Sequence, residues 1–366
     1  MAHFHETAKA VVQWKGVTRI LDADASRQLF EVILEPESND PAHLLGPMVK
    51  GLIGASRKAD FAGQLYLNVG HTGLDKRAHT AWIEQSCTRP VYFVHDLIPI
   101  THPEYCRPGE PEKHVRRIEA IFANSIGVIG NSQHTLDEFA ARRTMRPMPH
   151  MLVAPLGVTA VDRSARREKA VPVPARPYFV MLGTIEGRKN HLLILNIWAD
   201  LARRLGPASP LLVVIGQRGW ESEQACDMLD RSEAIRGHVI ELPRCDDAHL
   251  AAYMANARAL LFPSFAEGYG LPLVEALAPG TPVIASNLSV FRELANDIPD
   301  YLSPIDGLGW SRTIEDYAEE NSPARAAQVA RMTGWHPPQW SDHFRLVDEW
   351  LTQFSLAPQR APAASG

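Results

Sequence analysis

The sequence contains few cysteines, and their positions exclude two kinds of site. Cys87, Cys106, Cys226 and Cys245 are scattered through 366 residues without a CxxC pair. Structural zinc sites and disulfide frameworks both need recurrent, closely spaced cysteines, so we expect neither here. A chain that keeps its cysteines apart is typical of a reducing environment, and we therefore expect a cytoplasmic protein.

Long hydrophobic runs are also missing. No apolar stretch approaches the roughly 20 residues that a membrane-spanning helix needs. The first residues, Met1 to Glu6, lack the charged-then-apolar order of a secretory signal. These absences leave open only a peripheral contact with the inner face of a membrane.

The chain has no excess of positive charge that would attract nucleic acid. Its formal net charge is −5 and its pI is about 6.3. Hydrophobic residues make up 45% and charged residues 22%, which is typical of a soluble globular protein. A chain of 366 residues is too long for one ordinary core, so we expect two domains.

Short apolar runs alternate with longer amphipathic stretches, and this pattern predicts parallel sheets covered by helices. In the second half the predicted strands are Tyr178–Leu182, Leu211–Ile215, His238–Leu242, Ala259–Phe262 and Pro282–Ala285. The predicted helices between them are His191–Leu205, Glu221–Ile235, Asp247–Asn256 and Leu271–Ala278. The first half has a looser version, with strands at Gln64–Val69, Val91–Val94, Gly127–Ile129 and His150–Val153, and helices at Pro111–Ala123 and Gln133–Ala141. The fold class is α/β, with two Rossmann-like, doubly wound domains that face a cleft.

Composition sets the predicted domain boundaries. A basic, proline-rich stretch at residues 161–177 favours an extended linker over a surface loop within one domain. It separates a first domain at residues 1–160 from a second at 178–333, which a helix at 334–356 and a disordered tail at 357–366 follow. Before Gly63 we predict a strand at Phe30–Leu34 and a helix at Ala42–Ile53.

The segment FPSFAEGYGLPLVE, residues 262–275, indicates a ligand site at the end of a buried strand. Gly268 and Gly270 let the backbone bend sharply and approach a ligand. Free amides at the start of the following helix suit a phosphate. Glu267 and Glu275 can accept hydrogen bonds from vicinal hydroxyls, on a sugar ring and a ribose respectively. From spacing alone, a tight loop flanked by two solvated glutamates explains the pattern equally well.

The same segment resembles the signature of a large family of retaining glycosyltransferases with the GT-B fold (family 4). That family carries a Glu-x7-Glu motif here, and EGYGLPLVE continues into ALAPGTPVIA, a helix, a small-residue turn and a strand. The resemblance implies that Gly268, Tyr269, Gly270, Leu271 and Glu275 bind the donor and that Glu267 is catalytic.

A second segment agrees with this resemblance. The predicted strand Tyr178–Leu182 leads into GTIEGRKN, in which Arg188 and Lys189 lie just before an apolar helix. Cations at a helix start are misplaced unless an anion joins them, and a diphosphate is such an anion. Thr184 stands where the family often has Arg, and Arg188 supplies that charge, as in the family branch that reads GT-x-E-x-RKN. Arg188 and Lys189 are the implied catalytic cations.

Two glycines at strand ends are further donor contacts that the resemblance implies. Gly183 follows the strand Tyr178–Leu182, and Gly216 follows Leu211–Ile215. Such contacts are largely made by the main chain, so the side chains in these loops carry little information about ligand binding.

In the first half, His95 and Asp96 follow the predicted strand in YFVHDLIP. The family carries a histidine on this strand that reaches the donor sugar, so the resemblance implies a catalytic His95. Without it, a buried structural histidine is an equal alternative. Asp96, His71 and Asn131 are assigned to the acceptor side.

The resemblance covers residues 90–305 well and the first sixty poorly. Many family members begin with a strand and a glycine-rich loop that lies against the diphosphate, and only Gly16 to Arg19 stands near that place. The segment Trp335–Trp350, which includes Trp340 and Phe344, resembles the family's closing helix, which packs back on the first domain.

The resemblance implies a retaining, metal-independent hexosyltransferase in surface polysaccharide synthesis. No DxD-type metal motif stands where a diphosphate would need it, so we predict neither a metal site nor a cofactor. The expected partners are a GDP- or UDP-linked sugar, with GDP-mannose favoured by the GT-x-E-x-RKN loop, and a glycan or lipid-linked oligosaccharide acceptor.

Three other functions are alternatives to this one. The first is an inactive GT-B partner subunit of a glycan-assembly complex. The second is a GT-B nucleotide-sugar epimerase or a phosphorylase, although no lysine stands in a setting that would hold a phosphorylase's cofactor. The third, a dinucleotide dehydrogenase, is excluded because no GxGxxG follows an early strand.

Overall fold

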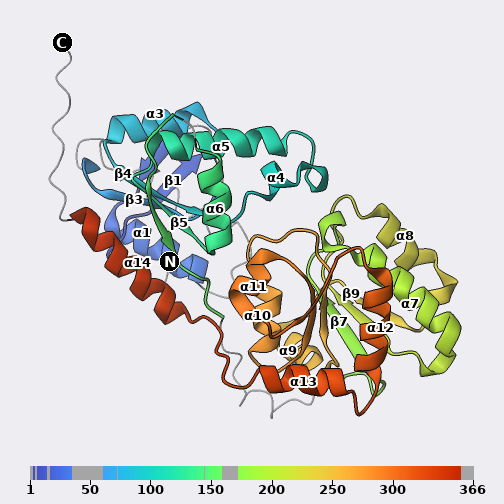
Figure 1. Ribbon diagram of the computed structural model, residues 1–366. Coiled ribbons are helices and arrows are strands. Elements are labelled where there is room, and N and C mark those ends of the chain that lie inside the picture. The colour runs from blue at the N-terminus through green and yellow to red at the C-terminus, as the bar shows by residue number, and fades with distance from the viewer. Residues whose placement is uncertain are drawn as a thin grey trace.

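A computed structural model describes residues 3–4, 6–14, 17–34, 61–71, 73–143, 145–158 and 172–355. Figure 1 shows two lobes, each built around a sheet with helices packed against it. Within the described chain no helix is long and apolar enough to cross a bilayer. The predicted helix Ala42–Ile53, the tail and most of the predicted linker lie outside the described residues.

The first lobe contains a four-stranded parallel sheet in the order β3-β4-β5-β6. Its strands are β3 (Leu65–Asn68), β4 (Arg89–Val94), β5 (Gly127–Gly130) and β6 (His150–Val153). Its helices are α3 (Arg77–Ser86), α4 (Ile98–Thr101), α5 (Glu110–Asn124) and α6 (Gln133–Ala141). One face packs against α5 and α6 through residues such as Ile121 and Phe139. Parallel pairing with both faces covered explains why these strands are nearly continuous apolar runs.

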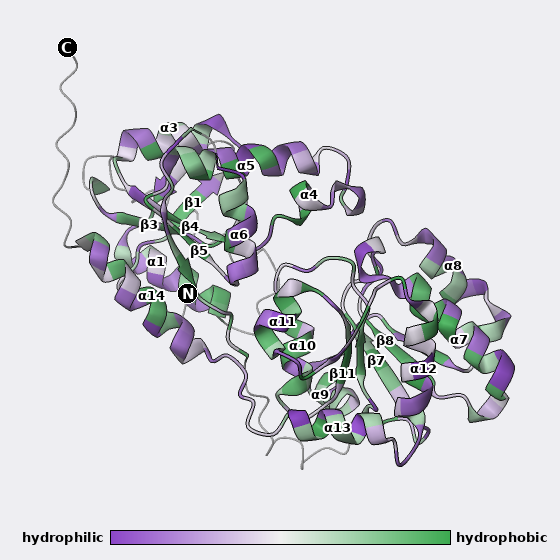
Figure 2. Cartoon of the chain, viewed as in Figure 1, coloured by the Kyte–Doolittle hydropathy of each residue, from purple (hydrophilic) through white to green (hydrophobic). Residues whose placement is uncertain are grey.

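The second lobe contains a six-stranded parallel sheet in the order β12-β11-β10-β7-β8-β9. Its strands are β7 (Tyr178–Leu182), β8 (Leu211–Ile215), β9 (Val239–Leu242), β10 (Leu260–Phe262), β11 (Val283–Ser286) and β12 (Asp300–Leu302). Its helices are α7 (His191–Leu205), α8 (Glu223–Arg231), α9 (Asp247–Asn256), α10 (Leu271–Leu277), α11 (Ser289–Ala295), α12 (Gly307–Ala318) and α13 (Pro323–Arg331). Two hydrophobic cores, one on each face, enclose the sheet. Figure 2 shows the same division, with hydrophobic strands inside and hydrophilic residues along the outer sides of the helices.

The predicted strand Phe30–Leu34 is wrong, because these residues end the helix α1 (Ala23–Leu34). Ala25, Ser26, Leu29 and Phe30 are the buried residues of α1, and their spacing of three and four is helical. Before α1 the chain forms a hairpin that the sequence did not predict. Its strands β1 (Val11–Trp14) and β2 (Val17–Ile20) pair with each other and, among the described residues, form a two-stranded sheet separate from both parallel sheets.

The last helix, α14 (Trp340–Ser355), returns to the first lobe, as predicted, and Figure 1 shows it lying along that lobe. Val347, Leu351 and Phe354 pack against β4 and β5. The helix begins at Trp340, six residues after the predicted start at residue 334, because Pro337 and Pro338 deny a helix to the preceding segment.

Candidate active site

The residues predicted to hold the donor lie at the point where the strand order of the second sheet reverses. In sequence order, β7 and β10 are the first and fourth strands of this sheet, and they are neighbours in its middle. Ligands of open α/β sheets bind beyond the carboxyl ends of the strands at such a point. The loop after β7 carries Arg188 and Lys189, and the loop after β10 carries Glu267.

The carboxylate of Glu267 joins both cations. Its Oε1 lies 2.5 Å from Lys189 Nζ, and its Oε2 lies 2.8 Å from an Arg188 guanidinium nitrogen. Ser264 Oγ donates a further hydrogen bond of 2.8 Å to Oε1. The Glu267 side chain is only 7% exposed, so these bonds replace water that the carboxylate has lost.

A second acid balances the charge of this cluster. Glu186 Oε1 lies 2.7 Å from the other terminal nitrogen of Arg188, and Glu186 is buried. The four side chains therefore hold two positive and two negative charges in a shielded place. Neither Glu186 nor Ser264 was predicted to have a role, although both lie inside the segments that predicted the site.

Burial and charge act in opposite directions on the ionisation of this cluster. Burial works to raise the pKa of Glu267, but Lys189 and Arg188 outweigh it and hold the pKa below its usual range. Burial works to lower the pKa of Arg188, and Glu267 and Glu186 outweigh it, so that pKa lies above its usual value. Both groups are charged at neutral pH.

The local backbone explains how the loop after β7 presents its cations. Residues Gly187–Lys189 form a single 3₁₀ turn, and Asn190 ends it in the left-handed region with φ of 58°. The side-chain amide nitrogen of Asn190, Nδ2, donates to Pro263 O at 3.2 Å and to Pro304 O at 2.8 Å. The amide of Phe265 donates to Arg188 O at 2.8 Å. The loops after β7 and β10 are thus fastened together before any ligand is considered.

Gly183 and Gly216 are required by different features of the backbone. Gly183 has φ of +132°, a conformation that residues with a side chain rarely adopt. A Cβ on Gly216 would lie 2.0 Å from Gly183 O, so no side chain fits there. The predicted contact of both glycines with a nucleotide stays a prediction.

Gly268 and Gly270 also stand where there is no room for a side chain. A Cβ on Gly268 would lie 2.6 Å from Asp96 Cβ and 2.9 Å from His95 O, both in the first lobe. Gly270, at the start of α10, has φ of +111°, and a Cβ there would lie 2.8 Å from a ring carbon of Phe291 on α11. The loop after β10 therefore touches the end of β4, and the structure brings His95 and Asp96 to the donor loop.

His95 is held in place by three neighbours in the first lobe. Its Nε2 lies 2.8 Å from Val69 O, which places the ring proton on Nε2. Its amide points at His71 Nε2, 3.4 Å away, and Asn131 Nδ2 donates to its carbonyl at 2.9 Å. Asn131 is buried, so in this structure its amide supports the backbone of His95.

His71 is a neutral imidazole packed among other histidines. Its ring centroid lies 5.4 Å from that of His95 and 5.1 Å from that of His114. Burial, together with the charges of His114 and His95, lowers the pKa of His71 to about 3. This side chain remains uncharged throughout the physiological range.

The remaining predicted donor residues lie on α10 or next to it. The Tyr269 ring is buried, and its hydroxyl donates to Leu156 O at 2.8 Å, which ties this loop to the segment after β6. Leu271 and Glu275 are exposed on α10, and neither joins the cluster around Glu267. Partial burial and the charge of Asp247 raise the pKa of the Glu275 carboxyl.

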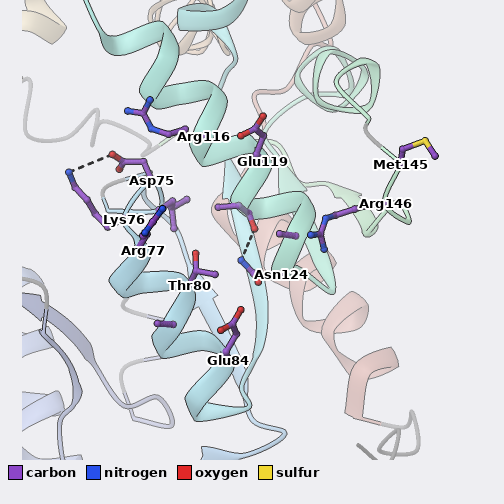
Figure 3. Close-up of a pocket in the computed structure, with 14 residues that line it drawn as sticks. Asp75, Lys76, Arg77, Thr80, Glu84, Arg116, Glu119, Asn124, Met145 and Arg146 are labelled. Atoms are coloured by element: carbon purple, nitrogen blue, oxygen red, sulfur yellow. Dashed lines mark hydrogen bonds and ion pairs between the residues drawn. The ribbon is translucent and has the colours of Figure 1, made fainter. Parts of the chain in front are cut away.

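The described chain also has a hollow away from this site, and its acidic, histidine and cysteine side chains form no candidate metal site. A hollow of about 710 Å³ opens between α3 and α5 on the first lobe, and Figure 3 shows Thr80, Arg116 and Asn124 lining it. None of the predicted site residues lines this hollow. Within the described residues, no group of three His, Cys, Asp or Glu side chains is arranged to hold a metal ion.

Comparison with protein-family models finds a match over much of the second lobe. Residues 162–299 match the family described as glycosyl transferases group 1. The matched segment contains the loops after β7, β8 and β10, and therefore Arg188, Lys189 and Glu267.

Curated relatives of the chain include two mannosyltransferases of Escherichia coli. One is the serotype-specific mannosyltransferase WbdA, 26% identical over 66% of this chain and 32% of its own length. Another is O-antigen chain mannosyltransferase B, 27% identical over 68% of this chain and 67% of its own length. The chain thus spans about a third of the length of WbdA.

Among solved structures, the Anabaena protein Alr3699/HepE, crystallised in complex with UDP, has the same fold. It superposes with a TM-score of 0.60 and 16% identity, over 85% of this chain and 82% of its own. The two-lobed architecture described above is therefore the GT-B fold.

Proposed function

We propose that this chain is a glycosyltransferase that uses a nucleotide-activated sugar, because residues 162–299 match the glycosyl transferases group 1 family and the chain has the GT-B fold. The observation that carries the proposal is the cluster of Arg188, Lys189 and Glu267 at the reversal point of the second sheet. The named activities of the two E. coli relatives favour mannose as the transferred sugar and a surface polysaccharide as the product.

The proposed donor is GDP-mannose or another GDP- or UDP-linked hexose or deoxyhexose. Its diphosphate would take the place of Glu267 as the counter-ion of Arg188 and Lys189. Glu267, released from its present pairing, would then accept hydrogen bonds from the sugar hydroxyls. Glu275 would hold the ribose, and the amides of Gly268–Gly270 would bind phosphate oxygens.

We further propose that the transfer retains the anomeric configuration. The acceptor hydroxyl attacks the anomeric carbon on the face from which the diphosphate leaves. The bond from that carbon to the phosphate oxygen breaks, the bond to the acceptor oxygen forms, and the acceptor proton goes to the departing diphosphate. Arg188 and Lys189 stabilise the negative charge that grows on the leaving group, and His95 contacts the sugar.

A panel of nucleotide sugars tests the proposal by thermal unfolding. A donor at about 100 times its Kd stabilises the protein by about 2.7 kcal/mol. We expect GDP-mannose or a related nucleotide sugar to raise Tm by several degrees, while mannose alone leaves it unchanged. If no nucleotide sugar shifts Tm, the enzyme proposal fails.

Metal independence is a second expected result. Two side-chain cations in the site can supply the charge that a divalent ion supplies in other glycosyltransferases. Transfer should therefore continue at the same rate in EDTA. Loss of activity with EDTA, and its recovery with Mn²⁺, would contradict this expectation.

One observation favours a second candidate function. Glu267 already neutralises Arg188 and Lys189, which is also what a site that never binds diphosphate would show. The alternative is a catalytically inactive GT-B subunit of a glycan-assembly complex. Calorimetry with GDP and UDP separates the two, because only the enzyme is expected to bind a nucleotide.

A further inference from the structure

A segment of the first lobe reaches the loops of the proposed donor site. Residues Ile98–Gly109, here called the arm, connect β4 to α5 and include α4 and a 3₁₀ turn at Pro103–Tyr105. Figure 1 shows α4 on the side of the first lobe that faces the second lobe.

Tyr105 of the arm packs between the two loops that carry the charged cluster. Its ring stacks on Phe265, with centroids 5.6 Å apart and an interplanar angle of 13°. A Cβ on Gly187 would lie 3.6 Å from Tyr105 Cδ1, so the ring also lies against the loop after β7. Gly187 immediately precedes Arg188, and Phe265 is two residues before Glu267.

The arm also contacts a third loop, the one after β8. Trp220 Nε1 donates to Tyr105 O at 3.4 Å, and the guanidinium of Arg107 lies 4.6 Å from the centre of the Trp220 ring. The amide of Gly219 donates in turn to Ile185 O at 2.9 Å. Three separate loops of the second lobe are thus joined to one short segment of the first.

The arm carries a thiol, Cys106, which follows Tyr105 directly. Burial and the charge of Asp96 raise the pKa of this thiol, and the charge of Arg188 opposes that rise. Cys106 is partly buried, so its reaction with an alkylating agent reports whether the arm is seated.

We propose that the arm holds together the loops after β7, β8 and β10, an arrangement here called the clasp. We also propose that Tyr105 is a positioning residue for Arg188 and Glu267. Seated between Gly187 and Phe265, its ring fixes the distance between the loop with the cations and the loop with the carboxylate. This inference rests on the proposed function, because it is for the binding of a nucleotide sugar that the alignment matters. It adds a second segment of the first lobe, after the one that carries His95 and Asp96, to a site built mainly from the second lobe.

The seating of the arm can be measured without any donor. In a background with Cys87, Cys226 and Cys245 changed to Ser, Cys106 is the remaining thiol, and its alkylation by N-ethylmaleimide is followed by mass spectrometry. We expect Tyr105→Ala to speed alkylation about 3- to 10-fold, the range expected for loss of an aromatic stack, and Tyr105→Phe to keep the parent rate. Phe265→Ala should speed it to the same extent, and the double variant should be no faster than either single one. Equal rates in Tyr105→Ala and Tyr105→Phe would overturn the clasp.

The positioning role is tested by kinetics with the donor. Tyr105→Ala should lower kcat/KM for the nucleotide sugar about tenfold and leave the KM for the acceptor and the Tm of the free protein unchanged. Tyr105→Phe should restore kcat/KM, since the ring is kept. A fall in Tm with no selective effect on the donor would instead mark Tyr105 as a structural residue and overturn the proposal. If GDP and UDP bind to no variant while Tyr105→Ala still speeds alkylation, the clasp is supported and the proposed function fails.

Discussion

The substitution Glu267→Gln is expected to lower turnover by about 10²-fold or more, because it removes an ordering contact close to the reacting carbon. The same change should make GDP or UDP bind more tightly, by roughly tenfold. In the free protein Glu267 forms ion pairs with both Arg188 and Lys189. A diphosphate must therefore displace a carboxylate that lies 2.5 Å from Lys189 Nζ. A neutral amide removes that competitor. Steady-state kinetics and calorimetry measure the two effects separately.

A matched control for this prediction is Glu223→Gln. Glu223 is an exposed acid in the first turn of α8, and its substitution makes the same change of net charge outside the site. It should alter neither turnover nor nucleotide affinity. Normal turnover in Glu267→Gln would show that the site is assigned to the wrong residues. Slower turnover with unchanged nucleotide affinity would show that Glu267 does not compete with the diphosphate.

The substitution Lys189→Ala is expected to weaken nucleotide-sugar binding and to lower kcat, the latter by about 10²- to 10³-fold. Lys189 is buried, and its Nζ is held between the Glu267 carboxylate and the face of Phe262, 5.0 Å from the ring centre. A cation that is already in place at the leaving group lowers the activation free energy most, because no free energy is spent on moving it into position during the reaction. Kinetics over a range of donor concentrations would separate the two effects.

Lys113→Ala is the matched control for Lys189→Ala. Lys113 on α5 also forms an ion pair with a glutamate, at 2.6 Å from Glu110, but its side chain is 44% exposed. An exposed pair of this kind contributes at most about 1 kcal/mol, so its loss should leave both kinetic constants unchanged. A Lys189→Ala enzyme with a normal kcat would contradict a role for this cation at the leaving group.

Hydrophobic periodicity predicted most of the second lobe correctly. The bounds of β7, β8, α7 and α9 agree with the predicted ranges to the residue. Strands buried on both faces must be apolar throughout, and the helices that cover them must be apolar on one side, so both leave a direct record in the sequence. The prediction failed for residues 30–34, where a short apolar run belongs to a helix, because a few apolar residues in a row fit either period.

The sequence singled out charged residues that the structure places together, but it did not predict the contacts between them, and their catalytic roles stay predictions. Arg188, Lys189 and Glu267 were all singled out, and the structure brings them together. Their bonding to one another was not predicted. The hydrogen bond from the side-chain amide of Asn131 to the carbonyl of His95 was not predicted either, and the assignment of Asn131 to the acceptor side stays a prediction.

The sequence alone determined which segments are strands and helices, which loops are rich in glycine and where the cations and acids stand along the chain. Those features depend on neighbours a few residues away, so they can be read locally. Tertiary structure alone decided that β10 lies beside β7, that Glu267 therefore faces Arg188 and Lys189 from a distant part of the sequence, and that Tyr105 of the other lobe packs against both loops. Such contacts depend on strand order and on the approach of two lobes, which no local pattern of residues records.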